Sequence, residues 1–446
     1  MIGTVTYRQG DSVLAFGHPM MQLGPVDVPM ATAFIHDFVP SYSRTDKLGS
    51  TMEAVGALRS DGAWSVGGLV GPHPPTVPVD ITVTDETTGK RRSYHCDAAK
   101  EKTLTQSLVS MSIASALEAG FRPSGEGTAQ VSFEVEGERG AKVRRHNMHW
   151  DRGSIAAVCT QEIGTTLYVL RRNPFEPQEP SRVSVDISLS DTNLAASIEE
   201  VYTDETVAKA GETLTVHVVL RPWDGEPFEK VIELPLPEDL ERGQMRLGIC
   251  GGEFAYTMRG RLGLLVPDFD DLPSLLQDIE KTEYNNQLFV AAALPNDGLG
   301  VGKYLLHRLP SSIAGIMGSS RTTDLTGGKE EVSKLLDCEH VILGQAYLSL
   351  GTEDKTGARA ATPSPSGPTP PGGPPPAAGA ARGHAEPAAR VNPLTAPPLE
   401  WASVAAIRAW PEARPATGPP RPVNGPEEKP ESEEAPDAGE EVGEEG

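Results

Sequence analysis

Apolar and polar residues alternate in many short stretches between residues 2 and 352. A first set of alternating apolar positions is Val77, Val79, Ile81 and Val83, and a second is Ala129, Val131, Phe133 and Val135. A period of two predicts half-buried strands. Near the start, "GTVTY" and "SVLAF" flank the turn "RQGD", which contains Gly10. This pattern predicts a β-hairpin.

A regular series of short strands is predicted between Ser181 and about Leu265. The alternating sets are Val183, Val185, Ile187 and Leu189; then Leu214, Val216, Val218 and Leu220; then Met245, Leu247 and Ile249. Turn sequences such as "KAGE", "WDGEP" and "ERGQ" separate them. Short strands at regular spacing are typical of a β-sandwich, which we place at residues 179–265.

Two helices interrupt the strands. The first is expected at residues 103–120, with Thr103 as N-cap and Gln106 at the capping-box position. Its apolar face is formed by Leu104, Leu108 and Met111, and Gly120 ends it. The second begins after Asp271, a candidate N-cap, with Pro273 in its first turn. With strands expected in "QLFVAAAL" and "HVILGQAYLSL", residues 266–354 form a mixed α/β segment.

Composition changes sharply after Asp354. The chain has 46 Gly, 40 Pro and only 38% hydrophobic residues, and residues 355–446 are rich in Pro, Ala and Gly and then in acid. Such a segment cannot bury enough apolar surface to offset its ordering entropy, so we expect a disordered tail. Within it, residues 397–410 could form a short amphipathic docking helix. The predicted fold class is mainly β with some α (α+β).

Charge and hydropathy exclude several classes of function. The formal net charge of -23 argues against nucleic acid and anionic membrane surfaces as partners. No run approaches the roughly 18 apolar residues of a membrane span, and the N-terminal residues show no signal peptide. The four cysteines, Cys96, Cys159, Cys250 and Cys338, form no C-x-x-C pair, so they leave the redox compartment and disulfide status open.

Motifs for cofactors and metals are weak. "NDGLGVGKY" lacks the first glycine of a phosphate loop, because Asp297 stands there, and Tyr304 replaces the magnesium-binding hydroxyl. His146 and His149 in "RRHNMHW" and His95 and Cys96 in "YHCD" could bind a metal, but we expect "RRHNMHW" to be a loop, and no third ligand is set by spacing. We therefore predict no cofactor and no metal site.

No serine stands in a G-x-S-x-G nucleophile motif within the part expected to fold. Serines in glycine contexts occur in "GIMGSSRT", "RGSIA" and "KLGST", where caps and turns explain them better than catalysis does. A serine hydroxyl also needs a base within hydrogen-bond reach, which sequence spacing does not supply.

One histidine, His18, stands between Gly17 and Pro19 in the apolar stretch "VLAFGHPMMQLGPVDVPMATAFI". Two interpretations are open. His18 is either a structural histidine that ends a strand, as most isolated histidines are, or a catalytic base held at a rigid corner.

Three segments together resemble the SpoIVB-type serine peptidase family. They are "GTVTYRQGDSVLAFGHPMMQLGPVDVPMATAFIHDFVPSYSRTDKLGS", "VGALRSDGAWSVGGLVG" and "TVPVDITV", and the close resemblance covers residues 1–90. It implies a partial, trypsin-like β-barrel peptidase domain at residues 1–178, with His18 as the general base of a serine-peptidase triad. It also implies a protein or peptide substrate and an extracytoplasmic location in a bacterial cell envelope.

The chain departs from the family in one respect. The family's nucleophile motif, G-M-S-G-S-P, and the acid ahead of it do not occur among the 446 residues. We expect an N-terminally truncated peptidase, through gene-model error, frameshift or genuine loss, with little or no hydrolytic activity. The alternative is a non-catalytic envelope scaffold that uses the sandwich and the Pro-rich tail. The identity of the nucleophile and the oligomeric state stay open.

Overall fold

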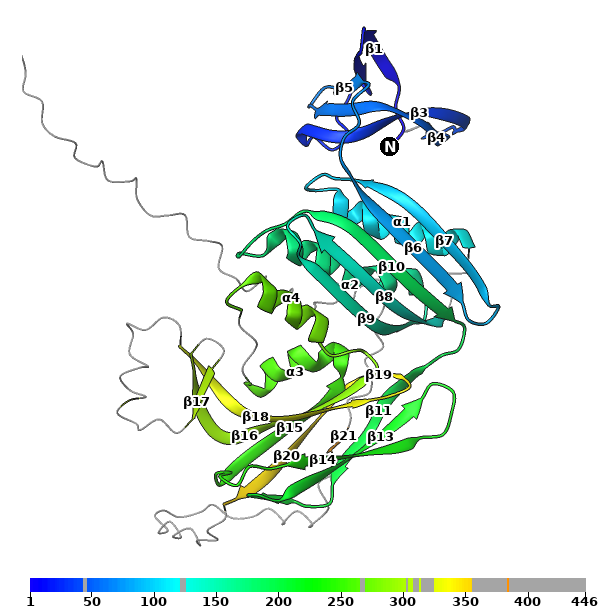
Figure 1. The fold of residues 1–446 in the computed structure, drawn as a ribbon. Coiled ribbons are helices and arrows are strands. Elements are labelled where there is room, and N and C mark those ends of the chain that lie inside the picture. Colours follow the sequence, from blue (N-terminus) through cyan, green and yellow to red (C-terminus); the bar gives the residue numbers. More distant parts are fainter. Residues whose placement is uncertain are drawn as a thin grey trace, which may run out of the picture. The chain divides into compact units, whose positions relative to one another are not determined.

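The protein is built mostly from β-strands, with few helices, and belongs to the α+β class (Figure 1). The computed structural model describes residues 1–42, 46–120, 126–264, 269–301, 304–307, 313, 325–354 and 383–384. Within these ranges, none of the helices is both long and apolar enough to cross a membrane.

The first sheet contains five antiparallel strands in the order β1-β2-β5-β4-β3. They are β1 (Val5–Gln9), β2 (Ser12–Ala15), β3 (Gly24–Val39), β4 (Asp46–Asp61) and β5 (Val66–Val70). The predicted hairpin is confirmed: β1 pairs with β2, and Gly10 in the turn has a φ of 56°, a conformation that glycine adopts without strain.

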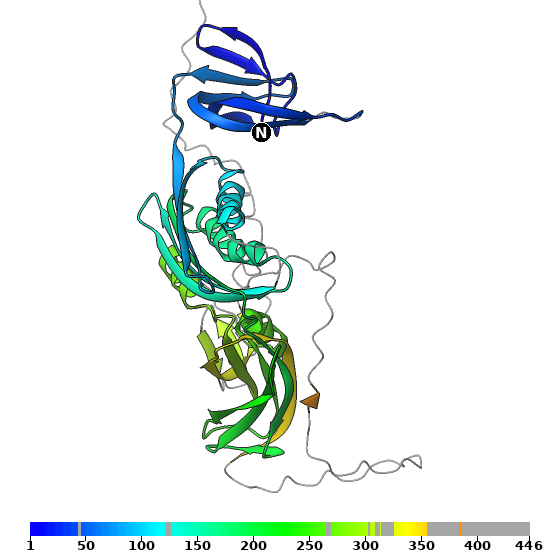
Figure 2. The same ribbon diagram turned by 90° about the vertical axis from the view of Figure 1, so that its right-hand side faces the viewer.

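The second sheet has the strand order β7-β6-β10-β8-β9. Its strands are β6 (Thr76–Asp85), β7 (Lys90–Ala99), β8 (Gly127–Gly137), β9 (Lys142–Asp151) and β10 (Pro180–Ser190). Helices α1 (Thr105–Gly120) and α2 (Ile155–Arg172) lie against one face, around which the sheet curves like half a barrel (Figure 2). The apolar positions predicted in β6 and β8 are buried against these helices, which confirms both strands.

Strand β10 belongs to the second sheet, although its sequence pattern grouped it with the later strands. It pairs in parallel with β6 and antiparallel with β8. Val183, Val185 and Ile187 of β10 are buried with the inward side chains of those two strands. Alternation predicted the strand correctly but carried no information about its partners.

Two further sheets share one hydrophobic core between residues 195 and 353. One has the order β14-β13-β11-β19, with β21 also paired to β11. Its strands are β11 (Ala195–Thr203), β13 (Thr213–Pro222), β14 (Phe228–Pro235), β19 (Val341–Leu343) and β21 (Gly383–His384). The other runs β12-β20-β15-β16-β17, with β18 paired to β16. Its strands are β12 (Val207–Lys209), β15 (Gly243–Gly251), β16 (Gln287–Val301), β17 (Tyr304–His307), β18 (Leu325–Asp337) and β20 (Gln345–Glu353).

Three short helical elements connect β15 to β16. They are the 3-10 helix η1 (Gly252–Phe254), α3 (Ala255–Leu262) and α4 (Leu272–Lys281). The predicted N-cap of α4 is confirmed. Asp271 accepts a hydrogen bond from the backbone N–H of Ser274 at 2.8 Å, and Ser274 completes a capping box.

The predicted N-cap of α1 is wrong, and its predicted apolar face is right only in part, because Leu104 and Leu108 are half-buried against core residues. The carboxylate of Glu101, rather than the side chain of Thr103, accepts the backbone N–H groups just ahead of α1, from Thr103 at 2.6 Å and Leu104 at 2.9 Å. Met111 is 63% exposed, whereas Val109, Ile113 and Leu117 are buried against the sheet. Contact with the sheet decides which face of the helix is buried, and this face is rotated from the apolar face that the sequence predicted.

The segment "RRHNMHW" is also not the predicted loop, since it forms most of β9 and pairs with β8. Its inward positions, Arg145, Asn147 and His149, are buried polar residues that hide the strand periodicity. The predicted tail and the predicted helix at residues 397–410 lie outside the described residues, except for the two residues of β21.

Candidate functional site

His18 lies in a turn that connects β2 to β3, the His18 turn (residues 16–23). The backbone enters the left-handed region at Phe16 (φ 77°) and Gly17 (φ 67°), and again at Gln22 (φ 60°). Left-handed φ at Phe16 and Gln22 is costly because their Cβ atoms crowd the backbone, so the surrounding structure has to hold it.

Asp61, at the end of β4, holds this turn in place. Its buried carboxylate accepts the backbone N–H groups of Met20 and Met21, each at 2.7 Å, and of Leu23 at 3.1 Å. Burial opposes the charge, but these backbone hydrogen bonds outweigh burial and hold the pKa of Asp61 below its usual range. A carboxylate 38 to 41 residues away thus determines the path of the chain just after Pro19.

The imidazole of His18 is exposed and its tautomer follows from one contact. Nδ1 lies 2.7 Å from the carbonyl oxygen of Pro19. A carbonyl oxygen only accepts, so Nδ1 carries the hydrogen and donates it, which leaves the lone pair on Nε2 in the neutral ring. The His18 ring lies 5.7 Å from that of Phe16. Nε2 is therefore presented to solvent as a proton acceptor.

The rest of a catalytic triad is not found beside this histidine. Among the described residues, no serine hydroxyl and no carboxylate contacts the His18 ring, and Asp61 is committed to the backbone of the turn. The structure thus places the predicted base in a defined turn without bringing it together with a nucleophile or an acid.

A serine–histidine pair that sequence reasoning missed lies elsewhere in the first sheet. Nε2 of His36 on β3 is 2.8 Å from Oγ of Ser50 on β4, and both side chains are exposed. Ser50 belongs to the "KLGST" segment, whose serine lacked a base in the sequence alone. Pairing of β3 with β4 supplies that base, so no signal short of the strand register could have revealed the contact.

Of the other two serine segments, the described part of the chain contains only one, and it adds no further serine–histidine pair. Ser154 in "RGSIA" is the exposed N-cap residue of α2. The segment "GIMGSSRT" lies outside the described residues.

The candidate metal ligands are dispersed. His95 Nδ1 lies 2.8 Å from Asp80, the exposed His146 ring lies 4.9 Å from the ring of Tyr284, and His149 is buried. Within the part of the chain that the structure describes, no group of three or more His, Cys, Asp or Glu side chains could hold a metal ion. The four cysteines are unpaired.

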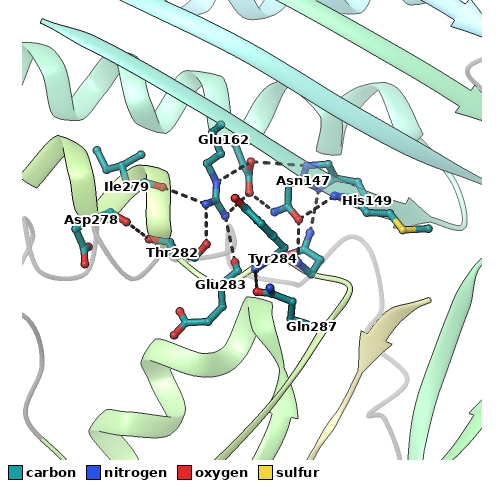
Figure 3. A network of polar contacts seen from close by, with 12 residues as sticks. Asn147, His149, Glu162, Asp278, Ile279, Thr282, Glu283, Tyr284 and Gln287 are labelled. Atoms are coloured by element: carbon teal, nitrogen blue, oxygen red, sulfur yellow. Dashed lines mark hydrogen bonds and ion pairs between the residues drawn. The ribbon is translucent and has the colours of Figure 1, made fainter. Parts of the chain in front are cut away.

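A buried polar cluster, the Arg145 network, is formed by Arg145, Asn147, His149, Glu162 and Asn285 (Figure 3). The side chains of Arg145 and Glu162 are each 1% exposed. Nε and Nη2 of Arg145 donate to the two carboxylate oxygens of Glu162 at 3.2 and 3.4 Å. This bidentate pair joins β9 to α2.

The remaining Arg145 donors reach the last turn of α4 and the segment after it. Nη1 donates to the carbonyl oxygens of Ile279 at 3.0 Å and Thr282 at 2.8 Å, and Nη2 donates to that of Glu283 at 3.1 Å. All five N–H groups of the guanidinium are therefore used, two on Glu162 and three on carbonyl oxygens of residues 279, 282 and 283. A guanidinium so completely paired connects these elements and has no donor left for a substrate.

Asn147 and His149 complete the cluster. Asn147 donates to Glu162 and accepts the backbone N–H of Asn285 at 2.8 Å. Nδ1 of His149 is 3.2 Å from Nδ2 of Asn285, and its Nε2 is buried 3.9 Å from Glu162 without a hydrogen bond. Burial is the main cause that lowers the pKa of His149, and Arg145 lowers it further against the attraction of Glu162. This network is a structural joint, and the exposed His18 turn is the better candidate for a functional site.

Comparison of the chain with known protein families, with curated proteins and with solved structures found no match.

Proposed function

We propose that this chain is a SpoIVB-type serine-peptidase homologue of the bacterial cell envelope that carries the general base, His18, but not the nucleophile segment. The observation that carries the proposal is the His18 turn itself. An exposed imidazole on a left-handed turn, held by the buried Asp61, is a costly arrangement that a merely structural histidine does not need.

The chemistry of the turn suits a base. Because the Nδ1–H of His18 donates to the Pro19 carbonyl, Nε2 is the atom that would take the proton from a serine hydroxyl. A carbonyl orients the ring as the triad carboxylate does, but it brings no negative charge to stabilise the imidazolium. We infer that full activity needs an acid as well as a serine from another polypeptide segment.

The proposal includes two fold assignments, a partial trypsin-like barrel and a β-sandwich. The first sheet, with its long strands β3 and β4, is assigned to part of a trypsin-like barrel, and the two sheets that share a core between residues 195 and 353 are assigned to a β-sandwich. The substrate class is a protein or peptide, and no cofactor is assigned.

A fluorophosphonate probe, which labels activated serines, tests the proposal. The 446-residue chain should give no label and cleave no peptide, because a base without a nucleophile loses nearly all triad catalysis. A chain extended at its N-terminus by a segment that carries the family's G-M-S-G-S-P motif should be labelled. In the extended chain, His18→Ala should abolish labelling, whereas His36→Ala should not.

Two results would refute the assignment. If the extended chain is not labelled, His18 is not the general base of such a triad. If the 446-residue chain is labelled and Ser50→Ala removes the label, the pair of Ser50 with His36 is the reactive centre instead. The alternative, a non-catalytic scaffold, is favoured because no described serine or carboxylate contacts the His18 ring. Under this alternative the probe should not label even the extended chain.

A further inference from the structure

The N-terminal region that contains the first sheet carries most of the exposed large hydrophobic side chains of the described chain. Thirteen of nineteen such residues lie between Met1 and Leu69. Solvent-exposed hydrophobic residues scattered singly need no explanation, but a concentration on one small sheet marks an interaction surface.

Three of these side chains form a row across neighbouring strands. Tyr7 on β1 lies opposite Leu14 on β2, and Leu14 lies opposite Gly67 on β5. Leu69 is two residues further along β5 and so projects from the same face as Tyr7 and Leu14. Their exposed fractions are 57%, 44% and 38%. The face of β1, β2 and β5 is therefore apolar and open.

The long hairpin of β3 and β4 exposes more apolar surface. Phe34 lies opposite Ser50, so Phe34 and Met52 share a face, and they are 56% and 62% exposed. A ribbon of two strands is at best marginally stable in water without a covering layer.

The unpaired edge at β1 indicates what kind of polypeptide would bind to this sheet. In the described residues β1 pairs only with β2, and all five of its residues are exposed. An unpaired strand edge is a template for another extended chain, because it presents a row of backbone N–H and C=O groups. A strand that adds to β1 satisfies this edge and places its own apolar side chains beside Tyr7 and Leu14.

Charge helps to identify the polypeptide that binds this surface. Residues 1–71 contain four Lys or Arg and six Asp or Glu, a net charge of only -2 out of -23. This near-neutral face suits an apolar strand, whereas a second copy would bring another 23 negative charges with it.

We propose that the first sheet is a docking surface for a different polypeptide, which adds an extended strand of alternating apolar and polar residues along β1. The proposal does not depend on whether that strand carries a serine.

Hydrogen exchange on the full 446-residue chain tests this surface, with a panel of synthetic peptides of alternating Val and Thr, Ile and Thr, or Phe and Ser as the probe. At up to about 1 mM, at least one peptide should slow exchange of residues 5–9 by about tenfold or more. The same peptide with N-methylated backbone amides should not. Leu14→Lys should weaken binding about tenfold, whereas Leu335→Lys, an equally exposed leucine on β18, should not.

Three outcomes overturn the proposal. They are the absence of slowing with every peptide, equal slowing by the N-methylated peptide, and equal weakening by Leu335→Lys. Sedimentation of the chain alone adds a fourth, because a dimer that Leu14→Lys disrupts would show that a second copy occupies the surface.

Discussion

The buried carboxylate of Asp61 accepts a hydrogen bond from the backbone N–H of Met21 at 2.7 Å, across forty residues of sequence. This contact, with those to Met20 and Leu23, links the end of β4 to the turn that presents His18. The position of the proposed base therefore depends on a residue that takes no part in its chemistry.

Replacement of this carboxylate should loosen the turn. In Asp61→Asn the uncharged amide accepts fewer and weaker hydrogen bonds, and we expect a local cost of about 1–3 kcal/mol. The amides of Met20, Met21 and Leu23 should exchange with deuterium correspondingly faster. Asp27→Asn is the control, because Asp27 pairs with Arg59 at a half-exposed site and should cost less than about 1 kcal/mol. Equal effects of the two variants would contradict the role given to Asp61.

Removing one partner of the buried Arg145–Glu162 pair should lower the free energy of unfolding far more than removing one partner of an exposed ion pair. Arg145→Met leaves the Glu162 carboxylate buried without its cation, at an expected cost of about 3–5 kcal/mol in urea-induced unfolding. Arg144→Met, at the next position of β9, removes an exposed ion pair with Glu134 and should cost less than about 1 kcal/mol. The double variant Arg145→Met with Glu162→Leu should be more stable than the sum of the single changes predicts.

The Arg145 network should weaken on mild acidification. Because the folded-state pKa of His149 is lowered, its contribution to stability is complete above the unfolded value of about 6.5 and is lost as the pH falls from there toward the folded pKa. The free energy of unfolding should be lower at pH 5 than at pH 7, and His149→Gln should reduce this difference. His146→Gln, an exposed histidine on the same strand, should leave the pH dependence as it is.

The four cysteine thiols should react with N-ethylmaleimide at two different rates, one fast and one slow. Cys96 is partly exposed, whereas Cys159, Cys250 and Cys338 are buried. Burial raises the pKa of the Cys159 thiol to about 12 and also raises those of Cys250 and Cys338, so thiolate is scarce at these sites. Mass spectrometry after brief treatment with N-ethylmaleimide should find modification at Cys96 first, and at all four only after unfolding. Rapid native modification of Cys159 would contradict this order.

Local sequence patterns predicted the elements whose signals are themselves local. Alternation in β6, β8 and β13, the turn at Gly10 and the cap at Asp271 were read correctly, because side-chain direction, φ and capping depend on near neighbours. The prediction failed for β9, where Arg145 and Asn147 occupy inward positions. Their burial is compensated by Glu162 and by carbonyls more than 130 residues away, which no local window contains.

By itself, the sequence determined that this protein is β-rich, strongly acidic and punctuated by a glycine–histidine–proline corner, since these features depend on composition and on neighbours along the chain. Only the tertiary structure decided that Asp61 holds this corner, that β10 lies between β6 and β8, and that His36 meets Ser50. The physical reason is the same in each case. Strand register and long-range hydrogen bonds are selected by the packing of the whole fold, and the separation of two residues in sequence does not encode them.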